Sequence, residues 1–268
     1  MPEKKKPTVL ITNDDGIEAP GLRILWEAVR SHANATIVAP FFDQSGMGLS
    51  ITSRSPLQME KVDWGVGNSS IWKVSGTPAD CVKLGLKVLF KEQKPDLVLS
   101  GINRGSNAGR CVLYSGTVGA TIEAAFRKVG GIAFSFADPE RTSVALAKQY
   151  IYPIVLYALA HPPSPGTILN VNFPSEDVEF KGITLSHQGR SYWEDHPDAR
   201  IHPEGNPYYW LGGKWVDHEE DERSDVFLLK QGYITITPIH VERLTDLDLL
   251  EKKSSDFMAH FKEFHPFS

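Results

Sequence analysis

The chain has little cysteine and few concentrated charges, and both facts exclude whole classes of protein. Its two cysteines, Cys81 and Cys111, form no CxxC pair, which argues against a disulfide framework or a cysteine zinc site. Apart from Lys4 to Lys6 there is no basic block, and the net charge is −5 at pH 7. The apolar stretch after that basic start, residues 8–12, is too short for a signal-peptide core. We therefore expect a cytoplasmic protein that binds neither nucleic-acid polymers nor membranes.

Several common catalytic motifs are also missing. The sequence has no GxxxxGK[ST] phosphate loop, no GxSxG nucleophile turn and no HExxH among its nine histidines. Residues 46–51, "GMGLSI", begin like a dinucleotide fingerprint but lack the third glycine. A P-loop enzyme, a serine hydrolase of the GxSxG type and an HExxH metalloprotease are therefore not indicated.

Strand and helix patterns alternate along the first 180 residues. Short β-branched runs predict buried strands, and apolar residues at helical spacing predict helices between them. The expected strands are 9–12, 35–39, 96–100, 132–136 and 168–173, with weaker pieces at 57–59 and 71–74. The expected helices follow Pro20 and cover 78–90, with Thr77 as the N-cap, 117–129 and 140–159. This order predicts an α/β fold, a doubly wound, Rossmann-like, mostly parallel sheet with helices on both faces.

The remaining residues, 181–268, do not continue the alternation of strand and helix patterns. "GITLSHQ" and "GYITITPIH" predict strands, and residues 247–261 predict a weakly amphipathic helix. Between the two strands, residues 189–225 are polar and rich in tyrosine and tryptophan, without a sustained period. Such a segment is either a surface arm on its own domain or an arm that packs on another subunit. The composition leaves both interpretations open.

The first strand ends on two carboxylates, Asp14 and Asp15, followed by Gly16. Ligands of open α/β sheets bind beyond the carboxyl ends of the strands, where residues 43–46 and Asn103 are also expected. Two adjacent carboxylates repel unless a cation lies between them, and oxygen ligands favour Mg²⁺ or Mn²⁺. The alternative is a simple Asp-Gly turn with Asp near a helix start.

A second polar corner precedes the helix expected at 117–129. Ser115, Gly116 and Thr117 lie at its start, where free N–H groups and hydroxyls suit a phosphate. Ser115 or Thr117 acting only as a helix cap is the alternative. Together with the acidic corner, this arrangement suggests a metal-dependent phosphatase.

Two other classes of protein place acids in a similar position. A signalling receiver module needs an acceptor Asp after its third strand and a later Lys, whereas "DLVLSGIN" ends on Ser and Asn and "IAFSFADP" brings no Lys. Haloacid-dehalogenase phosphatases use an Asp-x-Asp pair, which the adjacent Asp14 and Asp15 do not match. Both are therefore disfavoured.

Seven segments between residues 9 and 240 resemble the successive signature blocks of the survival protein SurE family of nucleotidases. They are "VLITNDDGIEAPG", "VAPFFDQSG", "GTPADCVKLG", "PDLVLSGINRGSNAG", "YSGTVGATIEA", "LNVNFP" and "GYITITPIH". They stand in the family's order and span nearly the whole chain.

This resemblance implies a phosphomonoesterase that hydrolyses nucleoside 5′-monophosphates, and also 3′-monophosphates, with a metal-activated water. It implies one divalent cation per subunit, Mg²⁺ or Mn²⁺, on Asp14, Asp15, Ser45 and Asn103. It further implies phosphate contacts from Asn107 and the turn Ser115, Gly116 and Thr117. A short-chain exopolyphosphatase and a non-catalytic metal- and phosphate-binding signalling module are the alternatives. No residue is assigned as general base.

The resemblance also implies an assembly and a division of the chain. Residues 1–180 form the metal- and phosphate-binding core, and residues 181–268 an extended β-hairpin arm, a closing strand and a C-terminal helix. The arm and the C-terminal segment exchange between subunits in this family, which implies a homodimer or homotetramer. One departure concerns residues 46–50, Gly-Met-Gly-Leu-Ser, where the family often has small residues. A more apolar lip there bears on substrate preference, and the preferred base is not fixed by the sequence.

Overall fold

The computed structural model describes residues 6–66, 70–138, 140–141 and 143–264. The strands are β1 (Thr8–Thr12), β2 (Asn34–Pro40), β3 (Met59–Lys61), β4 (Ser70–Val74), β5 (Leu97–Arg104), β6 (Gly130–Phe136), β7 (Thr167–Phe173), β8 (Gly182–Leu185), β9 (Tyr192–Ile201), β10 (Pro207–Val216) and β11 (Tyr233–His240). The α-helices are α1 (Pro20–Val29), α2 (Pro78–Leu84), α3 (Gly116–Phe126), α4 (Val144–Ala160), α5 (Asp225–Lys230) and α6 (Leu247–Phe264). A π-helical turn, η1 (Gly85–Leu89), continues α2, and a 3₁₀ turn, η2 (Gly109–Leu113), precedes α3.

One nine-stranded sheet has the order β3-β4-β2-β1-β5-β6-β7-β11-β8. The strands from β4 to β7 in this order pair in parallel. The chain builds outward from β1 through β2 to β4, then returns to the other side of β1 and continues through β5, β6 and β7. The order therefore reverses between β1 and β5, the point at which doubly wound sheets bind ligands. The expected α/β fold is confirmed.

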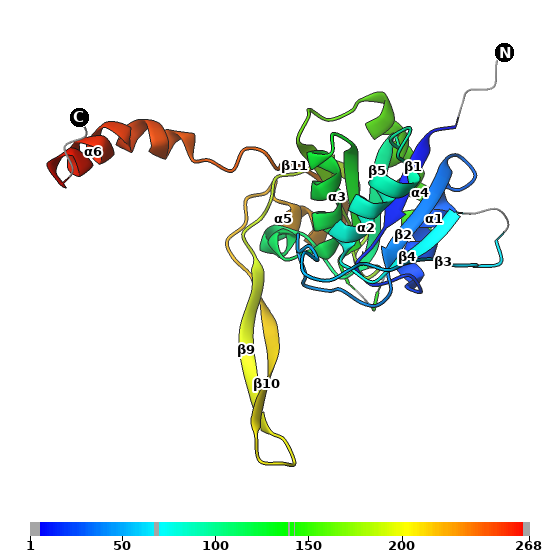
Figure 1. Cartoon of the computed structure of the whole chain (residues 1–268), viewed down its shortest axis with the longest axis horizontal. Helices are drawn as coiled ribbons and strands as arrows, with labels where there is room; N and C mark the ends of the chain where they lie inside the picture. The colour runs from blue at the N-terminus through cyan, green and yellow to red at the C-terminus, as the bar shows by residue number, and fades with distance from the viewer. Residues whose placement is uncertain (1–5, 67–69, 139, 142, 265–268) are drawn as a thin grey trace.

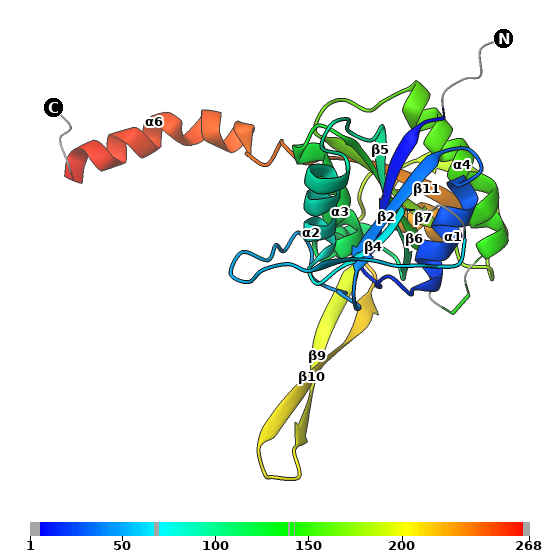
Figure 2. The same ribbon diagram turned by 45° about the vertical axis from the view of Figure 1, so that its right-hand side comes forward.

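Helices cover both faces of this sheet, with α1 and α4 on one face and α2 and α3 on the other (Figures 1 and 2). Strand β1 contributes side chains to the hydrophobic core on each face of the sheet, because successive side chains of a strand point to opposite faces. Val9 and Ile11 pack in the core with α1 and α4, whereas Leu10 packs in the core with α2 and α3. Because these side chains are fully buried, each contributes about 1.5–3 kcal/mol to stability.

Two helix starts show how local sequence sets the elements. At α2 the Thr77 hydroxyl accepts from the Asp80 N–H (3.2 Å) and the Asp80 carboxylate accepts from the Thr77 N–H (3.1 Å), so the expected Thr77 cap is confirmed. The expected start of the long helix at residue 140 is wrong. The helix α4 begins at Val144 because Ser143 is its N-cap, with its hydroxyl accepting from the Leu146 N–H at 3.3 Å.

The segment 189–225, which composition alone describes as irregular, is mostly regular. It forms a two-stranded antiparallel hairpin of β9 and β10, paired from Tyr192 with Val216 to Ile201 with Pro207. The hairpin stands away from the sheet, and α6 also extends from the body (Figure 1). We call the hairpin the arm. The cross-strand pairing of the arm was implied only by the family resemblance, because its two exposed faces leave no alternation of apolar and polar residues to detect.

None of the helices in the described part of the chain is both long enough and apolar enough to pass through a lipid bilayer.

Candidate metal and phosphate site

The carboxyl ends of β1, β2 and β5 meet at the point where the strand order reverses. Two hydrogen bonds connect the three corners there. The Gln44 N–H, after β2, donates to the Asp14 carbonyl at 2.7 Å, and the Arg104 N–H, at the end of β5, donates to the Asp15 carboxylate at 3.3 Å. The structure thus brings together the segments of the expected metal-binding residues.

The turn after β1 depends on Gly16. Its φ is +96°, a region that residues with a side chain rarely adopt. A Cβ at this position would lie 3.1 Å from the carbonyl carbon of Phe42, so the turn also allows close approach of the loop after β2. The Asn13 side chain donates to the Gly16 carbonyl at 2.8 Å and closes the turn. Sequence and backbone geometry together therefore fix where the two carboxylates project.

The acids at this turn have unusual electrostatics. Burial raises the pKa of Asp14 from 3.8 to about 6, and the negative charge of Asp15 adds to the increase, although a hydrogen bond from Thr117 opposes it. Burial also raises the pKa of Asp15, and the charge of Asp43 raises it further. Burial and mutual repulsion both disfavour the ionised forms of these carboxylates. A cation bound between them would favour the ionised forms.

The donor set fits a hard divalent cation. Asn103 donates its amide N–H to the Gly105 carbonyl at 2.8 Å, so its amide oxygen is the atom available to a ligand. Ser45 is exposed, and its backbone N–H donates to the Asp43 carboxylate at 2.7 Å. Within the described ranges, no group of three or more His, Cys, Asp or Glu side chains is placed to hold a metal. The set of Asp14, Asp15, Ser45 and Asn103 is thus an oxygen set, which Mg²⁺ or Mn²⁺ prefers and Zn²⁺ does not.

The start of α3 lies against Asp14. A Cβ on Gly116 would lie 2.9 Å from the Asp14 Cβ and 3.1 Å from its Oδ2, so only glycine allows this approach. The Thr117 hydroxyl donates to Asp14 Oδ1 at 2.5 Å. Thr117 therefore orients the acid, a role that the sequence did not suggest.

Ser115 is the N-cap of α3, because its hydroxyl accepts from the Val118 N–H at 3.1 Å. This confirms the capping alternative for Ser115, and it leaves the hydroxyl hydrogen available for another acceptor. The N–H groups of Gly116 and Thr117, at the first turn, have no partner among the hydrogen bonds of the described residues. The helix start therefore keeps the features of an anion site, and phosphate binding there stays a prediction.

Asn107 belongs to a buried cluster of amides. Its N–H donates to the Asn172 side-chain oxygen (2.9 Å), its side-chain amide donates to the Ser135 hydroxyl (2.7 Å), and its carbonyl accepts from the Asn170 side chain (2.9 Å). The cluster holds the loop 104–108 over the ends of β6 and β7. Asn170 and Asn172 were missed as site-supporting residues, although two asparagines at alternate positions of a buried strand were a visible signal.

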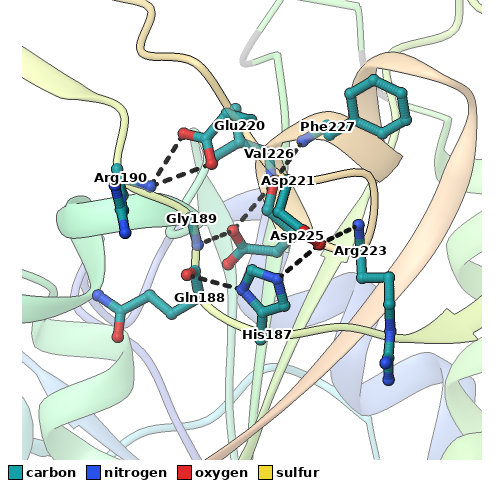
Figure 3. A network of polar contacts seen from close by, with 11 residues as sticks. His187, Gln188, Gly189, Arg190, Glu220, Asp221, Arg223, Asp225, Val226 and Phe227 are labelled. Atoms are coloured by element: carbon teal, nitrogen blue, oxygen red, sulfur yellow. Dashed lines mark hydrogen bonds and ion pairs between the residues drawn. The ribbon is translucent and has the colours of Figure 1, made fainter.

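Asp225 anchors the root of the arm to the same loop. This fully buried carboxylate accepts from the N–H groups of Gly109 (3.2 Å), Gly189 (2.8 Å) and Val226 (2.8 Å). Burial raises the pKa of Asp225, and the three N–H donors oppose the increase. Glu220, at the other side of the root, accepts from the Arg190 N–H at 2.9 Å (Figure 3). The arm therefore begins next to η2, between Asn107 and Ser115.

Comparisons of sequence and fold with known proteins identify one family. The model of the family "Survival protein SurE" matches residues 9–195. A "5'-nucleotidase SurE" from Protochlamydia amoebophila is 48% identical over 94% of this chain and 97% of the relative, and one from Flavobacterium psychrophilum is 40% identical over 88% and 93%. The crystal structure of the SurE protein from Aquifex aeolicus superposes with a TM-score of 0.79 and 37% identity, over 93% of this chain and 100% of that chain. By these matches, the chain belongs to the survival protein SurE family.

Proposed function

We propose that the chain is a divalent-metal-dependent phosphomonoesterase that hydrolyses nucleoside 5′-monophosphates, and also 3′-monophosphates, to nucleoside and phosphate. The relatives named 5'-nucleotidase SurE support this, since one is 48% identical over nearly the full length of both chains. The observation in this chain that carries the proposal is the contact between Asp14 and the first turn of α3. This contact supports the proposal because it brings an acid of the proposed cation site directly beside the N–H groups of the proposed anion site.

In this proposal Asp14, Asp15, Ser45 and Asn103 hold one Mg²⁺ or Mn²⁺ per subunit. When bound, the cation supplies positive charge that stabilises the phosphoryl oxygens and activates water as the nucleophile. Thr117 holds the Asp14 carboxylate in one orientation by donating to Oδ1. Gly16 and Asn13 hold the turn that carries both acids.

The phosphate is held by the N–H groups of Gly116 and Thr117 and by the Ser115 hydroxyl. Asn107 completes this set through the side-chain hydrogen that it does not donate to Ser135. N–H groups at a helix start are fixed before substrate arrives, so they stabilise growing negative charge on phosphate without reorganising. The amide cluster around Asn107 supplies the same rigidity on the other side.

Residues 1–180 carry this site in our proposal, and residues 181–268 supply the arm, closing strand and C-terminal helix used for assembly into a homodimer or homotetramer. Exposed apolar side chains on both projections support assembly, among them Trp210, Leu211, Leu247 and Phe257. We place the protein in the cytoplasm, which is consistent with Cys81 and Cys111 being free.

The test is phosphate release from nucleoside 5′- and 3′-monophosphates and tripolyphosphate. Protein stripped of metal is compared with the same protein supplied with Mg²⁺ or Mn²⁺. We expect release from the monophosphates only when a cation is restored. Release from tripolyphosphate alone would favour a short-chain exopolyphosphatase, and no release from folded protein with either cation would contradict an enzymatic role.

A further inference from the structure

Large apolar side chains are exposed on two segments that border the candidate site. They are Phe42 (76% exposed), Met47 (41%) and Leu49 (39%) after β2, and Leu113 and Tyr114 (71% each) before α3. Ser45 stands within the first segment, and Ser115 directly follows the second. We call these five side chains the apolar lip. Water-exposed apolar groups so close to a polar site mark a place where a ligand covers them.

The two segments of the lip are tied to each other. The Gly48 N–H donates to the Tyr114 carbonyl at 3.0 Å. A Cβ on Gly119, in the first turns of α3, would lie only 2.3 Å from the Gly48 carbonyl oxygen, so the loop after β2 rests on the helix backbone. The lip is therefore an ordered edge of the site that packs on α3.

Further hydrogen bonds tie the end of the first segment to α2. The Ser50 carbonyl accepts from the Thr77 hydroxyl at 2.6 Å, and the Thr52 N–H donates to the Asp80 carboxylate at 3.0 Å. The capping box of α2 thus holds the loop as well as the helix. Because these contacts hold the loop after β2, its exposed side chains have defined positions before any ligand binds.

The two aromatic residues of the lip lie on backbone segments that border the turn carrying the acids. The backbone of Phe42 lies against Gly16, which follows Asp15 in the turn after β1. Tyr114 lies two residues before Gly116, whose backbone lies against the Asp14 side chain. An extended ligand with its anionic end at the acids and the start of α3 would therefore leave the site past the segments that carry both rings.

We propose that the lip binds the base of the nucleotide, with Tyr114 and Phe42 as its stacking residues. This rests on the proposed nucleotidase function and deepens it. A nucleobase has flat apolar faces that stack on aromatic rings regardless of which base is present. Met47 and Leu49 add apolar surface without directional hydrogen bonds, so the site discriminates weakly among bases but strongly against a substrate that has none.

The experiment compares adenosine 5′-monophosphate with ribose 5-phosphate, which has the same sugar and phosphoester but lacks the base. For the wild-type protein we expect a higher kcat/KM for the nucleotide. In Tyr114→Ala and in Phe42→Ala this preference should fall by roughly tenfold, mainly through KM, because stacking on one ring is lost. Activity on ribose 5-phosphate should stay within about twofold, and Tyr114→Phe should retain most of the preference.

A matched control is Tyr157→Ala. Tyr157 is 60% exposed on α4, on the other face of the sheet. Tyr157→Ala is therefore the same substitution of an exposed tyrosine, made away from the lip. It should leave the preference unchanged. An equal fall for both substrates in Tyr114→Ala, or a change in its mass by light scattering, would overturn the inference, because the ring would then support the fold, the chemistry or a subunit contact.

Failure of the proposed function is distinguishable from failure of this inference. If the wild-type protein hydrolyses neither substrate, the nucleotidase proposal fails, and the lip is then tested by calorimetric binding of the two compounds with Mn²⁺ present. Tighter binding of the nucleotide that is lost in both Tyr114→Ala and Phe42→Ala supports the lip as a base site. Equal binding of the two compounds by the wild-type protein overturns it.

Discussion

Asp14 and Asp15 are neighbours in sequence but differ in their surroundings. Asp14 is only 3% exposed and is held by Thr117, whereas Asp15 is partly exposed and, among the residues that the structure describes, accepts a single bond of 3.3 Å, from the Arg104 N–H. Replacing Asp14 would disturb the start of α3 as well as the acid cluster. Asp15 is therefore the residue at which the role of the charge can be separated from the role of packing.

We expect Asp15→Asn to lower phosphate release at least about 100-fold, because it removes a charge from the proposed cation site. The fold should survive. The pKa of Asp15 is raised in the folded protein, so its ionised form is disfavoured by folding. Without metal, the variant should be at least as stable as the wild type at neutral pH, and any gain should vanish below the unfolded pKa of 3.8, where both states are protonated.

Thermal unfolding with and without Mn²⁺ provides the independent measurement. The wild type should be stabilised by the cation, and Asp15→Asn much less so. Asp96→Asn is a matched control, since Asp96 accepts from the Thr8 N–H (2.7 Å) at the opposite end of β1. Activity of Asp15→Asn within a few fold of the wild type would show that Asp15 is not needed at the site.

At the scale of elements, the site was predictable where the sequence determines the backbone. The run Val9 to Thr12 ending at an Asp-Asp-Gly turn, and the serine before α3, placed two corners correctly because strand ends and helix caps follow local rules. The bond from Thr117 to Asp14 was not predictable. It joins residues 103 positions apart and depends on how α3 packs beside β1.

The position of Asp43 at this edge of the sheet was expected, but its effect on the two acids was not, for a related reason. Its own sequence neighbourhood indicates only a turn, and its charge matters because the fold brings it near Asp14 and Asp15.

The strands of the arm could not be predicted from the pattern of apolar and polar residues. With solvent on both faces, its strands have no buried side to impose a period of two, so only the family resemblance implied a hairpin.

A polar clasp joins β8 to the entry of α5 through an isolated bridge between His187 and Ser224. Its side-chain part is His187 Nε2 with Asp221 Oδ1 at 3.0 Å, shown in Figure 3. The hydrogen bond to Asp221, followed by that to the Gln188 carbonyl, raises the pKa of His187 above 6.5. Asp221 in turn has a lowered pKa, chiefly because of the same bond.

We expect NMR titration to give His187 a pKa above 6.5 and Asp221→Asn to move it back toward that value. A raised histidine pKa means that the clasp contributes its full stability below pH 6.5, while Asp221 is ionised, and loses it as the pH rises through the folded pKa. His187→Gln identifies the resonance. His161, whose ring stacks on Tyr157 and lies outside the clasp, serves as the internal control. An unchanged His187 pKa in Asp221→Asn would contradict the clasp.

At the scale of the whole molecule, the arm and α6 both project from a body that has its own hydrophobic core (Figure 1). An isolated two-stranded hairpin is at best marginally stable in water. The arm also carries three large apolar side chains that are each more than 60% exposed, Tyr209, Trp210 and Leu211. Such side chains gain stability only when another surface covers them, and a second copy of the chain is the partner that the proposed assembly supplies.

The arm can be shortened without touching the body, because His196 pairs with Gly212 across it. Replacing residues 197–211 by an Asn-Gly turn removes Tyr209, Trp210 and Leu211, together with the exposed Ile201 and Tyr208, and keeps Glu220 and Asp225 at the root. We expect light scattering to report a smaller assembly. Replacing only residues 202–206 by the same turn, between the paired Ile201 and Pro207, is the control and should leave the assembly intact. If both variants keep the wild-type mass, the arm does not hold subunits together, and the exposed apolar side chains of α6 become the remaining candidate for a subunit contact.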